Sequence, residues 1–341
     1  MSGEITITGV ICKQYLAKYP TMTSMALARK VRKENPTVFS SIDAARCRLR
    51  YYRGQSGALA RKKAKDKQFF TYGEYQANPY GLPESHQDEW KPYFLDGIEK
   101  GLVISDIHIP YHDIVAVSVA LTAGIKHGVR EAKDKGVVLI NGDLIDFYQL
   151  SRFLKDPRKR NAKQEIEDTK RFLGTLREMY PDARIVYKEG NHDARYELYL
   201  MRHAEDLFDL LMDKASLAQV TDCFNLGIEY VGEKRYGVLY QLNILHGDEF
   251  WTSVSGQVNP ARGLFLRAKE CALCAHHHQS SEHVEPTIRE RQIATWSQGC
   301  LCELHPKYMR INKWNHGFVL LDVEGDQWQV FNKRIIKGAI V

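Results

Sequence analysis

Residues 1–54 carry apolar positions at helical spacing, interrupted by proline and glycine. The first helix is predicted over 10–19 and ends before Pro20, and the second runs from about Thr23 to Glu34 and ends at Asn35-Pro36. A third begins at Ser40 or Ser41, with Ser40 and Asp43 as a predicted capping box, and ends at Gly54. The pattern therefore predicts a small all-α domain.

From residue 100 the texture changes to short apolar runs that alternate with amphipathic stretches. The runs LVIS (102–105), VVLI (137–140) and RIVYK (184–188) are followed by predicted helices near 114–133, 161–179 and 194–214. This alternation predicts an α/β domain with parallel strands. After about residue 228 the pattern becomes rich in strands, with runs IEYVG, GVLYQLNILH, CALCA, RQIATWS, GFVLLDV and WQVFNKRII, so a further sheet is expected.

The length of 341 residues suits one large domain and a small one. We place a helical domain at 1–57, a linker at 58–95, which opens with a basic stretch, and the α/β domain at 96–341. No run reaches 18 apolar residues and the N-terminus lacks the pattern of a signal peptide, so no membrane association and a cytoplasmic location are expected. The seven cysteines are then expected to be thiols. The sequence leaves open whether the chain forms a homo-oligomer.

Charge is distributed unevenly along the chain. Residues 1–67 hold 15 Lys and Arg against four acids, a net charge of +11, whereas the rest of the chain sums to −5. Arg46, Arg50 and Arg53 are spaced i, i+4, i+7, which places them on one face of the third helix. This arrangement is typical of a helix-turn-helix DNA reader and predicts nucleic acid as a partner. The alternative is a solvated basic surface that binds nothing.

Ligand-type side chains follow five successive strand runs. They are Asp106 and His108, then Asp143 and Asp146, then Asn191, His192 and Asp193, then His246 and Asp248, and finally His276, His277 and His278. Ligands bind beyond the carboxyl ends of strands in α/β sheets, and a lone Asp or His there is usually a turn former. Five such sites in a row favour a site for divalent ions, and Asp, Asn and His ligands favour Mn²⁺, Fe²⁺ or Zn²⁺.

In their order and spacing these motifs resemble the calcineurin-like metallophosphoesterase superfamily. Its D-x-H, G-D-x-x-D, G-N-H-D and lone H-G motifs stand here at 106–108, 142–146, 190–193 and 246–247. The closing G-H-x-H motif departs at Ala275, a small residue that should be tolerated. The resemblance covers roughly residues 100–335 and implies a β-sandwich flanked by helices (α/β/β/α).

The resemblance also implies roles for single residues and two bound divalent ions, with Mn²⁺ favoured and Fe²⁺, Zn²⁺ or Mg²⁺ as alternatives. Asp106, His108 and His278 would hold one ion, Asn191, His246 and His276 the other, and Asp143 would bridge them. His277 falls on the x of its motif and is taken as a non-ligand, although the triple histidine leaves open which two ligate.

Three further residues are implied to act in catalysis. His192, oriented by Asp146, would be the general acid that protonates the leaving group. Arg195 could reach a substrate phosphate, and Arg262 is a weaker candidate for the same task.

A zinc site at Cys271, Cys274, Cys300 and Cys302 is a competing interpretation, which we disfavour because two of the four lie in an apolar strand.

The motifs fix the chemistry but not the substrate. The basic N-terminal region favours a phosphodiesterase or nuclease that acts on DNA, and the chain resembles phosphoesterases of phages and prophages and, less closely, nucleases of double-strand-break repair. Two alternatives remain open. One is a phosphomonoesterase or cyclic-nucleotide phosphodiesterase for small substrates, and the other is a DNA-binding regulatory protein with an inactive phosphoesterase domain.

Overall fold

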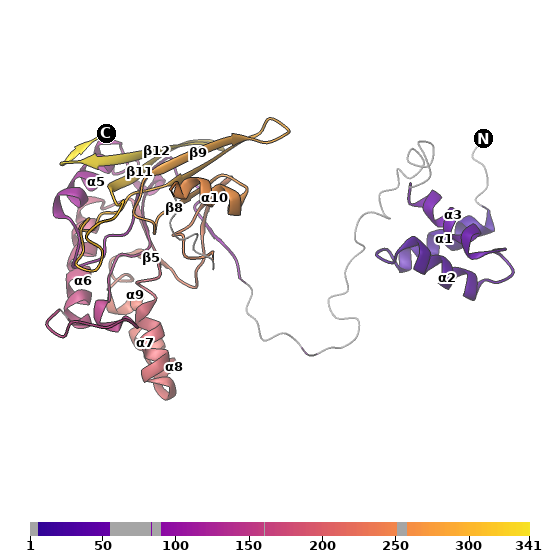
Figure 1. Ribbon diagram of the computed structural model, residues 1–341, viewed down its shortest axis with the longest axis horizontal. Coiled ribbons are helices and arrows are strands. Elements are labelled where there is room, and N and C mark those ends of the chain that lie inside the picture. The colour runs from indigo at the N-terminus through magenta and orange to yellow at the C-terminus, as the bar shows by residue number, and fades with distance from the viewer. Residues whose placement is uncertain (1–5, 55–82, 84–89, 160, 251–257) are drawn as a thin grey trace. The chain divides into compact units, whose positions relative to one another are not determined.

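A computed structural model describes residues 6–54, 83, 90–159, 161–250 and 258–341. The chain divides into two units, Met1–Asp88 and Glu89–Val341, which are described separately (Figure 1). Most of the predicted linker, with its basic stretch, lies outside the described residues.

The first unit contains three helices around a small apolar core: α1 (Ile7–Lys18), α2 (Ser24–Glu34) and α3 (Ile42–Tyr52). The buried side chains include Leu16, Leu27, Val31 and Leu49. The predicted capping box at Ser40 and Asp43 is wrong, because the cap is Ser41, whose Oγ accepts a hydrogen bond from Ala44 N at 3.0 Å. The three-helix pattern itself is present, since apolar spacing and proline breaks are local signals.

Arg53, the residue that follows α3, does not share the exposed surroundings of Arg48 and Arg50 in that helix. Its guanidinium donates to Ser24 Oγ at 2.8 Å and to the backbone carbonyl of Met22, so it ties the end of α3 to the segment that begins α2. Burial lowers the pKa of Arg53. Arg50 is exposed, and Arg46 lies 3.5 Å from Asp43. The outward charge of this helix therefore comes from the exposed Arg48 and Arg50 and the half-exposed Arg46.

The second unit is built on two sheets. The seven-stranded sheet has the order β13-β12-β11-β2-β3-β4-β5, and β2 to β5 are mutually parallel. Its strands are β2 (Lys100–Ile104), β3 (Gly136–Asn141), β4 (Arg184–Lys188), β5 (Ile228–Val231), β11 (His316–Glu324), β12 (Gln327–Ile336) and β13 (Ala339–Ile340). The six-stranded sheet has the order β1-β6-β7-β8-β10-β9. Its strands are β1 (Tyr93–Phe94), β6 (Gly237–Leu239), β7 (Leu242–Ile244), β8 (Ala272–Cys274), β9 (Ser281–Pro286) and β10 (Gln292–Ser297).

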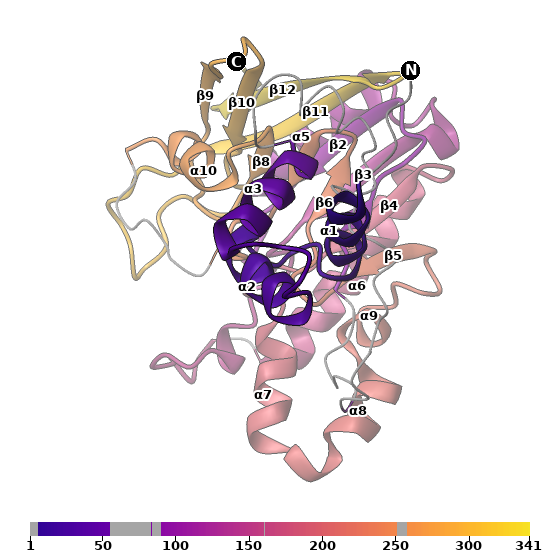
Figure 2. The same cartoon turned by 90° about the vertical axis from the view of Figure 1, so that its right-hand side faces the viewer.

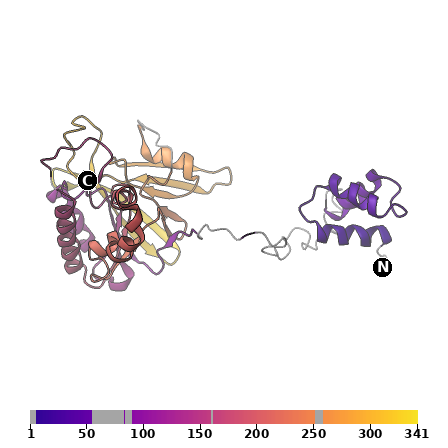
Figure 3. The same ribbon diagram turned by 90° about the horizontal axis from the view of Figure 1, so that it is seen from below.

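The two sheets pack face to face, and helices cover their outer faces (Figures 2 and 3). Because strand residues alternate in direction, Val103 points into the sandwich whereas Leu102 and Ile104 point towards the helices. The helices α5 (Ile114–Lys126) and α6 (Ala162–Met179) cover the seven-stranded sheet, and α10 (Pro260–Ala268) packs on the other. The predicted α/β/β/α fold with an N-terminal helical region is confirmed.

Some predicted elements differ in detail. The helix predicted near 114–133 ends at Lys126, just before Gly128, whose φ is +92°. The helix predicted near 194–214 is divided into α7 (Arg195–His203), a short 3-10 turn and α8 (Phe208–Ala215). The mostly exposed edge strand β9 was not predicted because its sequence, SEHVEP, is largely polar. Within the described residues, no helix combines the length and apolarity that crossing a membrane requires.

Candidate metal centre

The ends of β2, β3, β4, β7 and β8 meet at one edge of the sandwich, and the side chains that follow them converge there. Five of these residues have left-handed backbone, with φ between 49° and 66°: Asp106, His108, Asp143, His276 and His278. Non-glycine residues rarely adopt this conformation, and such strain gathers at functional sites. Here it turns the chain sharply after β2, β3 and β8, so that the side chains that follow these strands face the same space.

Two glycines allow the turns to approach each other closely. A Cβ on Gly142, where φ is +87°, would lie 2.3 Å from His246 Nδ1, and a Cβ on Gly190 would lie 2.4 Å from Asp143 Oδ1. Neither position has room for a larger side chain. The turns after β3 and β4 can therefore carry Asp143 and Asn191 into one site only because both glycines lack a Cβ.

A first group of donors consists of Asp106, His108 and His278, next to Asp143. His278 Nε2 lies 3.2 Å from Asp106 Oδ1 and 3.3 Å from His108 Nε2, and His108 Nε2 lies 3.7 Å from Asp143 Oδ2. Two donors bound to one ion at 2.0–2.1 Å lie about 3.0–3.4 Å apart in octahedral or tetrahedral geometry. The spacing within this group fits a divalent ion.

A second group of donors, which also adjoins Asp143, consists of Asn191, His246 and His276. His246 Nε2 lies 3.3 Å from Asp143 Oδ2 and 3.3 Å from Asn191 Oδ1. The donor atoms of Asp143, His246 and His276 all lie within 4.8 Å of one another. Asp143 Oδ2 faces both groups, whereas its Oδ1 accepts a hydrogen bond from the His192 amide at 2.8 Å. One carboxylate oxygen, not two, is therefore shared between the groups.

The oxygens of Asp143 and Asn191 in the second group face His246 Nε2, and a positive charge is needed between them. His246 Nδ1 lies 2.8 Å from the Asn141 carbonyl oxygen and must donate a hydrogen bond to it. In the neutral ring, Nε2 therefore points a lone pair at Asp143 Oδ2 and Asn191 Oδ1, unless Nε2 is also protonated. Burial acts to lower the pKa of His246, but the charge of Asp143 outweighs it and raises the pKa to about 10. A divalent cation would satisfy the same donors with the ring neutral. The residues therefore fit a metal ion.

The carboxylates of the centre are held ionised despite their burial. Burial alone would raise the pKa of Asp106, but the charge of His278 lowers it, and the pKa of this carboxyl lies below its usual value. Burial also opposes ionisation of Asp143, whose pKa is nevertheless lowered, chiefly by His246 and His192. The buried carboxylates of Asp106 and Asp143, both in contact with histidine rings, therefore also favour a bound cation.

His192 stands beside these groups and belongs to a hydrogen-bonded chain. Its Nδ1 lies 2.9 Å from Asp146 Oδ1, which fixes the ring, and Arg195 Nη2 donates to its Nε2 at 2.9 Å. Arg195 also donates to the Asp146 carbonyl at 2.8 Å. In this arrangement Nε2 is an acceptor, so it can carry a proton only after the Arg195 guanidinium has moved.

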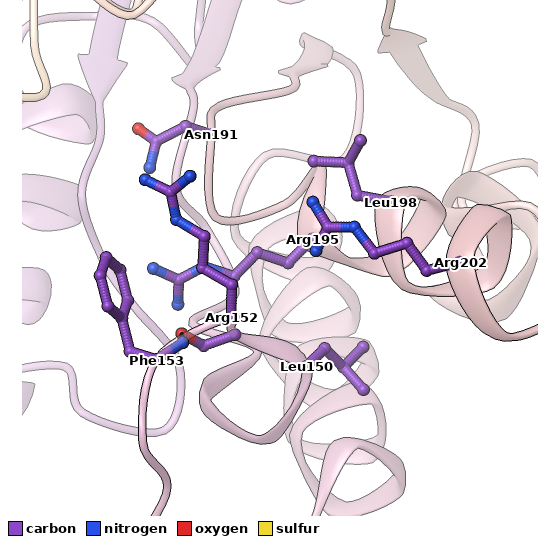
Figure 4. Close-up of a pocket in the computed structure, with 8 residues that line it drawn as sticks. Leu150, Arg152, Phe153, Asn191, Arg195, Leu198 and Arg202 are labelled. Carbon is purple, nitrogen blue, oxygen red and sulfur yellow. Dashed lines mark hydrogen bonds between the residues drawn. The ribbon is translucent and has the colours of Figure 1, made fainter.

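An arginine-lined pocket of about 230 Å³ adjoins the second donor group at Asn191. The side chains of Arg152, Arg195 and Arg202 extend towards the same space from the loop after β3 and from α7 (Figure 4). Leu150, Phe153 and Leu198 supply apolar wall. Guanidinium groups bind phosphate through paired donors, so the pocket is suited to an anion next to the centre.

Sequence reasoning placed Asp193 among the ligand-type side chains but did not predict that it joins the turns after β3 and β4. Asp193 is fully buried, and its Oδ2 accepts from the amides of Gly190 and Asp143 at 2.8 Å each. Its Oδ1 accepts from the Ile145 amide at 3.1 Å and from Tyr187 Oη at 2.6 Å. Four donors from three separate points of the chain cannot be inferred from motif spacing, although the G-N-H-D motif does contain this Asp.

A buried ion pair supports His246 in a similar way. Lys188 Nζ, at the end of β4, lies 2.8 Å from Glu249 Oε1, and Glu249 accepts from the amides of His246 and Gly247 at 2.8 and 2.7 Å. The side chains of Lys188 and Glu249 are 2% and 9% exposed. The sequence offers no signal for this pair, because the partners lie 61 positions apart.

The remaining sequence candidates lie outside these groups except Cys302, whose sulfur lies within 4.8 Å of donor atoms of His108 and His278. His277 is in none of the donor groups among the described residues, and Arg262 is exposed in the first turn of α10. Cys271 and Cys274 are buried at β8 and do not group with Cys300 and Cys302 in the described part of the chain. Cys302 instead lies 3.8 Å from His278 Nδ1.

The family model for calcineurin-like phosphoesterases matches residues 100–305. Among solved structures, the chain is similar to zinc-complexed Vps29 from Entamoeba histolytica, at 11% identity over 71% of this chain and 96% of that one, with a TM-score of 0.34. It is also similar to nuclease MPE from Pseudomonas putida, at 16% identity over 65% and 84% of the two chains, with a TM-score of 0.29. A search of curated proteins found no match.

The first prediction concerns Asp193. In the wild type, four donors surround the two carboxylate oxygens of Asp193. In Asp193→Asn only one side-chain oxygen remains to accept hydrogen bonds, so we expect the free energy of unfolding to fall by about 2–3 kcal/mol. Denaturant unfolding measures the change, with Asp209→Asn, an exposed site in α8, as the control. A loss below about 0.5 kcal/mol would contradict the bridging role.

The second prediction uses Glu165, which is fully buried in α6. Burial and the nearby charge of Asp146 raise its pKa from 4.5 to about 8. Between these values the folded state retains a proton that the unfolded state releases, so stability falls as the pH rises.

We therefore expect Glu165→Gln to flatten the decline in stability between about pH 5 and pH 8 in the metal-free protein. At pH 8 the variant should be more stable by about 1–3 kcal/mol. Thermal unfolding across this range measures the effect. Glu167→Gln, on the exposed face of the same helix, is the control. Equal slopes of stability against pH for the wild type and Glu165→Gln would rule out a raised pKa of Glu165 as the cause of the decline.

Proposed function

The chain belongs to the calcineurin-like phosphoesterases, and on that basis we propose that it is a two-metal phosphodiesterase that hydrolyses nucleic acid, with DNA as the favoured substrate. The observation that carries the proposal is the position of Asp143 Oδ2, which lies 3.3 Å from His246 Nε2 and 3.7 Å from His108 Nε2. A single oxygen between two donor groups suits a pair of ions that share one ligand.

In this proposal Asp106, His108 and His278 hold one ion, Asn191, His246 and His276 hold the other, and Asp143 belongs to both. The carboxylate, amide and imidazole donors suit Mn²⁺, Fe²⁺ or Zn²⁺, and the family resemblance favours Mn²⁺ among them. Two divalent ions, when bound, stabilise charge on a phosphoryl group and make water more acidic. The protein contributes the placement of these donors.

His192 is proposed to give a proton to the leaving oxygen from Nε2, while Asp146 holds Nδ1. Arg195 now occupies Nε2, and it must turn away before the ring can act as an acid. A phosphate next to Asn191 offers the guanidinium a stronger, charged partner than a neutral imidazole. Substrate binding would thereby release His192, so that proton transfer is coupled to occupancy of the site.

Two features support nucleic acid as the substrate class. The arginine-lined pocket offers a place for a second phosphate beside the scissile one, which a chain of phosphodiesters supplies and a small monoester does not. The basic first unit adds sequence-independent attraction to a polyanion. Neither feature favours a small phosphomonoester.

The third prediction tests the chemistry through Asp143. We expect Asp143→Asn to reduce both bound metal and kcat/KM on DNA by at least about 100-fold, because the shared oxygen loses its charge. Metal content by mass spectrometry and cleavage of labelled oligonucleotides are the readouts. Asp326→Asn, in the exposed turn before β12, is the matched control. Unchanged cleavage by Asp143→Asn would refute the catalytic assignment.

The substrate class is tested by comparing substrates for the Mn²⁺-loaded protein. DNA and RNA strands are compared with a phosphomonoester and a cyclic nucleotide. We expect cleavage of the strands, with DNA preferred. Intact strands together with rapid hydrolysis of a small ester would favour the small-substrate alternative, and no hydrolysis of any ester would favour the regulatory one.

The fourth prediction concerns the first unit of the full chain. The double variant Arg46→Ala/Arg50→Ala should weaken DNA binding and reduce the slope of log K against log salt by about 1–2, since each phosphate contact contributes about 0.9. Binding is measured by fluorescence anisotropy at several salt concentrations. Lys170→Ala/Arg171→Ala, on α6, removes the same charge and should leave the slope unchanged. An equal change of slope in both double variants would mean that the net charge of the chain, and not Arg46 and Arg50 in particular, governs DNA binding.

A further inference from the structure

A second pocket adjoins the first donor group and differs in chemistry from the arginine-lined one. It has a volume of about 110 Å³, and His108, His278 and Asp146 form one wall. Aromatic rings form much of the remainder: Tyr111, Tyr148, Tyr308 and Trp314. We call it the aromatic pocket. A phosphoester at the centre therefore has cationic side chains next to one donor group and flat rings next to the other.

The rings of the aromatic pocket are arranged around the candidate ligands. Trp314 packs edge-on against His278, with ring centroids 4.1 Å apart, and Tyr308 lies 6.4 Å from Trp314. Tyr308 is 71% exposed and lines the pocket, so part of its surface is open to a ligand. A tyrosine held beside a tryptophan at the mouth of a pocket offers a stacking surface for another flat ring.

Cations accompany these rings. Lys159 Nζ lies 4.1 Å from the ring centroid of Tyr148 and 4.7 Å from that of Tyr111, and Lys307 also lines the pocket. Aromatic rings interleaved with cations bind single-stranded nucleic acid, because bases stack on the rings while the cations follow the backbone.

We propose that the substrate is bound as a single strand, with one nucleobase in the aromatic pocket beside Tyr308 and Trp314 and a neighbouring phosphate in the arginine-lined pocket. In a duplex the bases already stack on each other and are paired, so a base must be unpaired to enter. This inference rests on the proposed function and adds to it the form in which nucleic acid is recognised.

The test compares strands that differ only in their bases. The Mn²⁺-loaded full chain is given a single-stranded oligonucleotide, the same oligonucleotide with abasic sites, and the matching duplex, and kcat/KM is measured for each. We expect kcat/KM for the normal strand to exceed that for the abasic strand by about 5- to 150-fold, the range for one stacked base, and to exceed that for the duplex as well.

Variants connect that preference to the pocket. Tyr308→Leu should bring the ratio of normal to abasic strand close to one, and Tyr308→Phe, which retains the ring, should preserve it. Phe224→Leu is the matched control, because Phe224 is 64% exposed and lies outside the pocket, and the wild-type ratio is expected there.

Three results would overturn the inference. They are equal cleavage of normal and abasic strands by the wild type, cleavage of duplex as fast as single strand, or a Tyr308→Leu variant that retains the full ratio. In each of these cases the proposed function still stands, since phosphodiesters are hydrolysed. Failure to cleave any of the three substrates would instead contradict the proposed function, and this inference with it.

Discussion

The buried carboxylate of Asp143 is the group on which the rest of the centre depends. Its side chain is 2% exposed, and histidines from three other turns of the chain lie within 4.0 Å of one of its oxygens. A charge so placed is costly unless it is compensated. Protonated imidazoles can compensate it, but a pair of divalent ions does so with neutral rings. Gly142, Gly190 and Asp193 are then needed to hold the turns at this separation.

Much of the fold and of the candidate site could be predicted because the signals are local. Apolar runs of strand length and amphipathic helical stretches give the α/β order, and each ligand type stands directly after a strand. Long-range partners could not be predicted. The pair of Lys188 and Glu249 and the four donors to Asp193 depend on which strand ends meet. Arg53 shows the same limit, since helical spacing placed it with Arg46 and Arg50, whereas tertiary contacts engage it inside the first unit.

The centre and its surroundings divide the work between them. The donors follow buried strands, where a change would disturb the core, whereas the two flanking pockets are built from connecting segments and α7: residues 148–159, 195–202 and 302–314. Binding residues commonly lie on such segments above a rigid scaffold. The centre accordingly defines the reaction, and the pockets define what is brought to it. Arg195 belongs to both, because it lines the arginine-lined pocket and contacts His192.

The most direct test of the two-ion centre is anomalous diffraction from crystals of the protein soaked in Mn²⁺. Two peaks about 3.5–4 Å apart are expected, one next to His108 and His278 and the other next to His246 and Asn191, both adjacent to Asp143. A single peak, or the absence of any peak next to Asp143, would contradict the two-ion centre.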